Sequence, residues 1–128
     1  MEASLKCILL VEDDTQLAAQ IKQFLASQGY EVDCVVDGHE AINRVRKAPP
    51  QCIILDALIP KMSGFQCARL LKFDEKLKKI PILMLTVLNR PADREKSKEV
   101  GVDLFLTKPF SQEGLLKAIQ QLIGGFSP

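Results

Sequence analysis

Three consecutive carboxylates, Glu12, Asp13 and Asp14, follow directly on the apolar residues 7–11. Two carboxylates about 4 Å apart repel by roughly 4 kcal/mol at an effective dielectric constant of about 20, so a cation is expected beside them. A short apolar run is typical of a strand buried on both faces of a parallel sheet. Ligands of open α/β sheets bind beyond the carboxyl ends of the strands, so the pattern predicts that Glu12 and Asp13 enter a site. The alternative is that Asp14 caps a helix and its neighbours are solvated loop acids.

Three later apolar runs are also followed by polar or charged residues. Asp56 follows residues 52–55, Thr86 follows residues 82–85, and Lys108 comes shortly after residues 104–106. Parallel strands end at the same edge of a sheet, so these side chains are expected to converge with Glu12 and Asp13. Three carboxylates and one lysine leave excess negative charge, which Mg²⁺ would relieve, since it binds one or two carboxylates together with waters and phosphate oxygens.

The remaining groups at this edge suit a phosphoryl group. Lys108 supplies a compact positive charge and Thr86 a hydroxyl donor. Aspartate can act as a nucleophile and form an acyl phosphate, and Asp56, at the end of a central strand, is the best placed. No glycine-rich phosphate loop follows the first strand, which argues against a nucleotide-binding protein or a flavodoxin-type electron carrier.

Composition predicts one globular domain without a membrane span. Hydrophobic residues make up 47% and charged residues 26% of the 128 residues, and the formal net charge of +1 gives no reason to expect nucleic acid or a membrane as the main partner. Residues 1–6 lack the features of a signal peptide, so a cytoplasmic location is expected. The cysteines form no Cys-x-x-Cys pair, and those in strand-like runs are expected to behave as small hydrophobic residues: Cys7, Cys34 and Cys52.

Strand-like and helical stretches alternate along the chain. This alternation predicts a doubly wound α/β fold, in which helices cover both faces of a parallel sheet. Strands are expected at 7–11, 32–36, 52–55, 82–85 and 104–106, and helices at about 15–28, 38–47, 64–72, 89–100 and after Ser111.

Local signals set several boundaries. Asp14 and Ser111 are predicted N-caps, and Asp37 and Glu40 resemble a capping box. Gly29 is a predicted left-handed residue after the first helix, and Gly124 and Gly125 are predicted to end the last helix. A charge inside the second strand, Asp33, suits an edge strand better than a central one.

The segment 89–100 differs from the other helices because it has many charges and almost no apolar stripe. We expect it to be weakly anchored and mobile. His39 is expected on the surface, as is a set of lysines interpreted as a solvated face: Lys61, Lys72, Lys76, Lys78 and Lys79.

The ordered motifs resemble those of a response-regulator receiver domain of two-component signalling, over about residues 5–123. They are Ile-Leu-Leu-Val-Glu-Asp-Asp ending at 14, Ile-Ile-Leu-Asp ending at 56 with Pro60 and Gly64 beyond it, Met-Leu-Thr ending at 86, and Phe-Leu-Thr-Lys-Pro-Phe ending at 110. The resemblance implies a flavodoxin-like (βα)5 fold with five strands in the order 2-1-3-4-5.

The resemblance also implies roles for single residues. Asp56 would accept a phosphoryl group from a sensor histidine kinase or a histidine phosphotransfer protein. Mg²⁺ would be bound directly by Asp13 and Asp56, through water by Glu12, and by the backbone carbonyl of Leu58. Lys108 would bind the phosphoryl oxygens, and the Lys108–Pro109 peptide bond would be cis.

Switching is also implied by the resemblance. Thr86 and Phe105 would move, and the surface of the fourth helix, fifth strand and fifth helix would change. The whole chain, 1–128, would be a single receiver without an output domain, acting on a downstream protein target or in a larger protein that supplies the missing output domain. It would be a monomer or a weak phosphorylation-dependent dimer, with no enzymatic activity beyond Mg²⁺-dependent self-phosphorylation and autodephosphorylation.

Four positions depart from the usual pattern of such domains. Val87 stands where alanine or glycine is usual, which predicts slower phosphorylation by small donors. Leu58 and Leu88 replace polar residues that often assist hydrolysis, which predicts a long-lived acyl phosphate. Ser63 replaces an acidic or amide residue and is expected to change only local capping.

Two other functions are compatible with parts of the pattern. A phosphate-independent pseudo-receiver would keep the fold as a protein-interaction module, and Val87 is the main feature in its favour. An aspartate-based phosphatase or dehalogenase is disfavoured because Asp56-Ala57-Leu58 lacks the second acid two residues on, and 128 residues leave no room for a cap domain.

Overall fold

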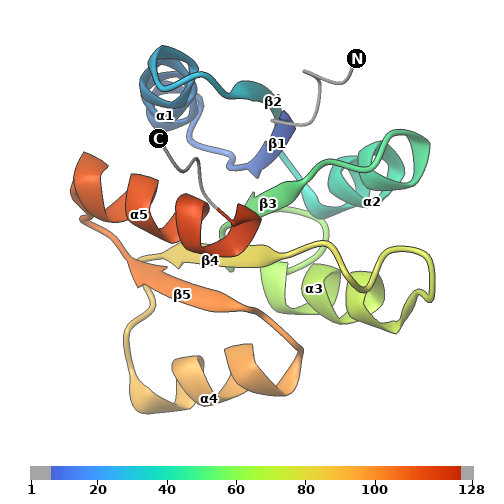
Figure 1. Cartoon of the computed structure of the whole chain (residues 1–128). Helices are drawn as coiled ribbons and strands as arrows, with labels where there is room; N and C mark the ends of the chain where they lie inside the picture. Colours follow the sequence, from blue (N-terminus) through green and yellow to red (C-terminus); the bar gives the residue numbers. More distant parts are fainter. Residues whose placement is uncertain (1–6, 125–128) are drawn as a thin grey trace.

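The computed structural model describes residues 7–124, in which five strands alternate with five helices (Figure 1). The strands are β1 (Cys7–Val11), β2 (Glu31–Val35), β3 (Cys52–Leu55), β4 (Ile82–Thr86) and β5 (Leu104–Thr107). The helices are α1 (Thr15–Ser27), α2 (Gly38–Lys47), α3 (Gly64–Phe73), α4 (Pro91–Glu99) and α5 (Gln112–Ile123).

The five strands form one parallel sheet in the order β2-β1-β3-β4-β5. Apolar residues of α1 and α5 pack on one face of the sheet, and those of α2 and α3, with Val100 beyond α4, pack on the other (Figure 1). The predicted doubly wound, flavodoxin-like (βα)5 fold is therefore confirmed. Its consequence for function is that all five strands end at the same edge.

The central strands fill both cores because their side chains alternate between the two faces. In β1, Leu9 and Val11 pack towards α2 and α3, whereas Ile8 and Leu10 pack towards α1 and α5. All of β3 and β4 is buried, as a strand covered on both faces requires.

The predicted caps are present. Asp14 accepts a hydrogen bond from the Leu17 N–H, Ser111 accepts one from the Gly114 N–H, and Gly29 has a φ of 96°. Asp37 accepts from the Glu40 N–H at 2.8 Å, but the Glu40 carboxylate faces the Val36 N–H at 3.5 Å rather than the backbone of Asp37. The capping box expected there is therefore only half formed.

β2 is an edge strand, as the charge of Asp33 predicted. The Asp33 carboxylate accepts hydrogen bonds from the Arg44 guanidinium on α2. β2 begins and ends one residue earlier than predicted, and Cys34 is exposed on it. The expectation that Cys34 would be buried like a small hydrophobic residue was wrong, because only Val32 of this strand is fully buried.

Lys72 does not belong to a solvated face. Its Nζ donates to the carbonyls of Lys78 and Ile80, at 3.1 and 3.0 Å, and to the Asp103 carboxylate at 2.9 Å. Asp103 also accepts from the Ile82 N–H at 2.8 Å. Lys72 thus joins α3 to the starts of β4 and β5, whereas the other lysines of the predicted face are exposed: Lys61, Lys76, Lys78 and Lys79.

α4 contributes few apolar side chains to the core, as its sequence predicted. Its two buried residues, Asp93 and Ser97, are polar, and the Asp93 carboxylate accepts from the Arg90 N–H at 3.1 Å. A cation–π contact adds to this, since Lys96 Nζ lies 4.9 Å from the centre of the Phe65 ring on α3. Few apolar side chains therefore hold this helix against the sheet. Its mobility stays a prediction.

Within residues 7–124, no helix is both long and apolar enough to cross a membrane. His39 is exposed, as expected, and the described cysteines are all free thiols. Residues 1–6, on which the signal-peptide argument rested, lie outside the described part of the chain, as does Gly125, predicted to end the last helix together with Gly124.

Candidate active site at the carboxyl edge of the sheet

Backbone hydrogen bonds hold the predicted site residues at the carboxyl edge of the sheet. The Asp56 N–H donates to the Val11 carbonyl at 3.2 Å, and the Lys108 N–H donates to the Thr86 carbonyl at 2.9 Å. Glu12 is tied to the next strand, because its N–H donates to the Val35 carbonyl at 3.1 Å. These bonds hold the end of β1 beside the ends of β2 and β3, and the end of β4 beside that of β5.

Lys108 lies between two buried carboxylates. Its Nζ donates to Glu12 Oε1 at 2.7 Å and to Asp56 Oδ2 at 2.9 Å. The Glu12 and Asp56 side chains are 3% and 7% exposed and that of Lys108 is 15% exposed, so water screens these charges weakly. The Lys108–Pro109 bond is cis, as the family resemblance implied.

Burial and hydrogen bonding shift the pKa values of Glu12 and Lys108 in opposite directions. Burial raises the pKa of Glu12 above its usual range, and the hydrogen bond from Lys108 offsets only part of that effect. Burial acts to lower the pKa of Lys108, but hydrogen bonds to Glu12 and Asp56 outweigh it and raise the pKa. Two carboxylates facing one ammonium group leave a net negative charge, which favours binding of a further cation.

The nucleophile candidate is positioned by its own loop. Asp56 Oδ1 accepts a hydrogen bond from the Leu58 N–H at 3.0 Å, which leaves Oδ2 facing Lys108. The loop after Asp56 leads back to the end of β3, because the Gly64 N–H donates to the Ala57 carbonyl at 2.9 Å. A Cβ at Gly64 would lie 2.2 Å from the Asp56 carbonyl oxygen, so only glycine fits there.

The predicted metal ligands differ in exposure. Asp13 is exposed, next to the buried Glu12, and Glu12 Oε2 accepts from the Asp14 N–H at 3.1 Å. Within residues 7–124, no group of three or more histidine, cysteine, aspartate or glutamate residues is arranged to hold a metal ion. Mg²⁺ needs only one or two carboxylates together with waters, and the excess negative charge and all-oxygen donors of this edge fit it chemically.

The predicted switch residues lie on neighbouring strands. Thr86 is fully buried, and its Oγ1 accepts from the Leu88 N–H at 3.4 Å. Phe105 is half-buried on β5, opposite Met84 of β4 in the strand register. The Arg94 guanidinium of α4 lies 4.7 Å from the centre of the Phe105 ring. Arg94 was not singled out from the sequence, because a contact between a charged helix and a distant strand leaves no local signal.

Apolar residues follow Asp56 and Thr86 closely in the sequence. Leu58 is 52% exposed and Val87 is 58% exposed, although both are large hydrophobic residues. Leu88 is half-buried and packs against the core on the α2 and α3 side of the sheet. Ser63 caps α3 and forms a capping box with Gln66, in agreement with the local role expected for it.

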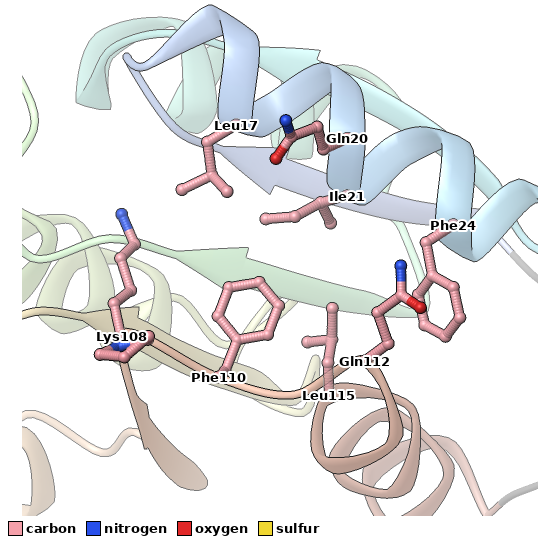
Figure 2. A pocket seen from close by; sticks show the side chains of 9 residues that line it. Leu17, Gln20, Ile21, Phe24, Lys108, Phe110, Gln112 and Leu115 are labelled. Carbon is pink, nitrogen blue, oxygen red and sulfur yellow. The ribbon is translucent and has the colours of Figure 1, made fainter.

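A separate apolar pocket of about 320 Å³ adjoins the site (Figure 2). Leu17 and Ile21 of α1 face Phe110 and Leu115 across it, and Lys108 lies at one end. The ion pairs of Lys108 are made with Glu12 and Asp56, neither of which lines this pocket. The pocket therefore separates α1 from the start of α5 and does not contain the polar chemistry.

Comparison with protein-family models identifies a match to the response regulator receiver domain over residues 8–120. Protein PilG of Pseudomonas aeruginosa is 31% identical over 121 residues, which cover 94% of this chain and 90% of that protein. The chain spans about half the length of several other curated relatives, which are named as transcriptional regulators.

Solved structures agree with this match. The chemotaxis response regulator CheY4 of Vibrio cholerae is 35% identical with a TM-score of 0.85, and the alignment covers 91% of this chain and 97% of that one. The receiver domain of the sensor histidine kinase PA1611 from Pseudomonas aeruginosa is 32% identical with a TM-score of 0.87, covering 94% of this chain and 98% of that one. The latter structure is described with a magnesium ion coordinated in its active-site cleft.

Proposed function

Because this chain belongs to the family of response regulator receiver domains, we propose that it accepts a phosphoryl group on Asp56 and thereby switches a protein-binding surface. The observation that carries the proposal is the position of Lys108, whose Nζ contacts both Glu12 and Asp56 at the carboxyl edge of the sheet. On this proposal residues 1–128 act as a single receiver domain in the cytoplasm, and signalling rather than turnover of a substrate is its task.

The transfer would begin with attack by Asp56. A carboxylate oxygen of Asp56 forms a bond to phosphorus while the bond from phosphorus to the donor nitrogen of a phosphohistidine breaks, and the donor imidazole leaves. The resulting acyl phosphate carries more negative charge than the carboxylate. Lys108, already within 2.9 Å of Asp56 Oδ2, can follow this charge and bind a phosphoryl oxygen.

Mg²⁺ is the cofactor in this proposal. Asp13, Asp56 and the Leu58 carbonyl would be its protein ligands, with Glu12 acting through a water molecule. When bound, the metal neutralises charge on the carboxylates and on the incoming phosphoryl oxygens.

Switching would follow from new contacts to the phosphoryl group. The Thr86 hydroxyl, which now accepts from the Leu88 N–H, would donate to a phosphoryl oxygen instead, and Phe105 would move inward as Thr86 leaves its place. The equilibrium then shifts towards the state that binds the modified Asp56 better. α4, with few apolar contacts, is suited to move with β5 and α5 and to change the surface that a partner reads.

The partners follow from this sequence of events. The donor would be a sensor histidine kinase or a histidine phosphotransfer protein. The receptor would be a downstream protein or an output domain outside this chain. The proposal needs neither nucleic acid nor a membrane as a direct partner.

The test is incubation with acetyl phosphate, with and without Mg²⁺, followed by intact-mass measurement. We expect one phosphoryl adduct in the wild type with Mg²⁺, and none without the metal or in Asp56→Asn. If the wild type gives no adduct, the measurement is repeated with Val87→Ala. Failure of both would refute the proposal in favour of the phosphate-independent pseudo-receiver.

A further inference from the structure

A second candidate surface lies away from the ion pairs of Lys108, on the outer side of α2 and α3. These helices lie side by side on the same face of the sheet (Figure 1). Two open hollows of about 380 and 310 Å³ adjoin there, and both are lined by Met62 and Leu70. We call this pair of hollows the α2–α3 groove.

Apolar side chains form part of the lining of the α2–α3 groove, beside polar ones such as Gln66 and Asn43. Leu70 is 45% exposed, and Phe73, one helical turn further along α3, is 75% exposed. Positions three and four apart share one face of a helix, so α3 carries an outward apolar stripe in addition to the one buried in the core. Neighbouring apolar side chains exposed in this way are typical of interaction sites.

The charged residues lining the groove are all cationic. Lys61 and Arg69 line one hollow, Arg46 lines the other, and no aspartate or glutamate lines either. Lys61 Nζ lies 3.5 Å from Asp37 Oδ2, so its charge is partly neutralised. Arg46 and Arg69 make no ion pair among residues 7–124, and the chain as a whole carries a net charge of only +1. The charges of Arg46 and Arg69 therefore stand without a carboxylate partner in the groove.

Arg69 is also held in place. Its guanidinium carbon lies 5.6 Å from the centre of the Phe73 ring, a distance typical of a cation–π contact. This contact restricts the Arg69 side chain and so reduces the entropy lost when a carboxylate binds to it.

We propose that the α2–α3 groove binds an acidic amphipathic helix of a partner protein. Apolar side chains of that helix, spaced three or four residues apart, would insert over Met62 and Leu70, and its flanking carboxylates would pair with Arg46 and Arg69. The proposal does not depend on phosphorylation of Asp56. The residues on which it rests already line the groove in the unmodified protein.

The test uses synthetic helical peptides and NMR chemical shifts of the full unphosphorylated chain labelled with ¹⁵N. The acidic peptide carries leucines at i, i+3 and i+7 with glutamates elsewhere. A scrambled peptide of the same composition and a peptide with lysine in place of glutamate are the controls. We expect saturable shifts confined to α2, α3 and residues 61–62 with the acidic peptide alone, weakened by added salt.

Variants locate the site. Arg69→Glu is expected to raise the Kd about tenfold, because it replaces an attraction with a repulsion of similar size, and Leu70→Ala is expected to weaken binding as well. Lys22→Glu makes the same charge change on α1, on the other face of the sheet, and is expected to leave the Kd unchanged.

Binding of the lysine peptide, equal binding of the scrambled peptide, or shifts centred on α1 and α5 would each overturn the proposal. So would an absence of any saturable shift.

Discussion

At the scale of single residues, two apolar side chains near Asp56 are expected to affect different steps, namely phosphorylation and hydrolysis. Val87 and Leu58 are both more than half exposed, although Val87 directly follows the buried Thr86 and Leu58 lies two residues beyond the buried Asp56. We expect Val87 to limit how easily a donor reaches the carboxylate, and Leu58 to leave an attacking water poorly oriented if an acyl phosphate forms.

Val87→Ala is expected to speed phosphorylation by acetyl phosphate. Removal of two methyl groups widens access to Asp56, and an increase on the order of threefold corresponds to less than 1 kcal/mol in the barrier. The rate can be followed by intact mass at saturating Mg²⁺. Equal rates for the two proteins would show that Val87 does not limit access.

The acyl phosphate of the wild type is expected to be long-lived, because Leu58 and Leu88 offer no hydrogen bond to an attacking water. Replacement of Leu58 by glutamine should shorten the lifetime, by about tenfold if one water becomes well oriented. Loss of the phosphoryl adduct after removal of the donor measures this. Decay of the wild-type adduct within seconds would contradict the prediction.

At the scale of secondary-structure elements, two features position the site without touching a substrate. Gly64 lets α3 begin directly against the backbone of Asp56, and Lys72 joins the other end of α3 to β4 and β5. α3 is therefore fixed at both ends.

Gly64→Ala is expected to destabilise the protein by about 3 kcal/mol, because the new Cβ would meet the backbone of Asp56 and Ala57. Gly29→Ala is the matched control. Its Cβ would meet no atom within 4 Å, and only the positive φ of 96° would be strained, which costs about 1 kcal/mol. Urea unfolding measures both, and similar losses in the two variants would argue against the close approach at Gly64.

Lys72→Met is expected to lower the free energy of unfolding by about 2 kcal/mol. The substitution keeps most of the aliphatic stem but leaves the Ile80 carbonyl and the Asp103 carboxylate without their ammonium partner. Lys76→Met, at an exposed position in the turn that follows α3, should change stability by no more than about 0.5 kcal/mol. Equal effects of the two substitutions on urea unfolding would show that the Lys72 contacts contribute little.

At the scale of the whole molecule, two buried cysteine thiols can serve as probes of unfolding, one on each face of the sheet. Cys52 lies in the core beside α1 and α5, and Cys67 lies in the core beside α2 and α3. Burial raises the pKa of each thiol to about 12, so the thiolate needed for reaction is scarce in the folded state at pH 8.

In a Cys7→Ser, Cys34→Ser variant, we expect both remaining thiols to react with a disulfide reagent only after unfolding, and at equal rates. A sheet shared by both cores should open as one unit. The rates should rise with pH between about 7 and 8.5, as the ordinary thiol pKa of the unfolded chain is approached. Faster reaction of Cys67 alone would show that the α2 and α3 layer opens separately.

Much of the fold could be predicted from the sequence, because short apolar runs and cap residues are local signals. The strands ended within one or two residues of their expected positions, and Asp14, Gly29 and Ser111 took the backbone roles expected of them. Convergence of Glu12, Asp56 and Lys108 could also be predicted, since parallel strands share an edge. The roles of Asp13 and of the Leu58 carbonyl stay predictions.

Contacts between distant side chains could not be predicted in the same way. Lys72 and Asp103 are 31 residues apart, and nothing in the charged run around Lys72 distinguishes it from its exposed neighbours. Cys34 lies in a run that is apolar except for Asp33, but its exposure depends on β2 lying at the edge of the sheet. Arg94 meets Phe105 only through the packing of α4 beside β5.

The strand order leaves two edges that differ in their resistance to aggregation. β2 carries Glu31 and Asp33, and such charges on an edge strand discourage another chain from extending the sheet. β5 at the opposite edge consists of Leu104, Phe105, Leu106 and Thr107, none of them charged, so its short length and the neighbouring α4 are its main protection. Any condition that loosens α4 or lengthens β5 would therefore expose this edge first, and intermolecular strand pairing is expected to begin there.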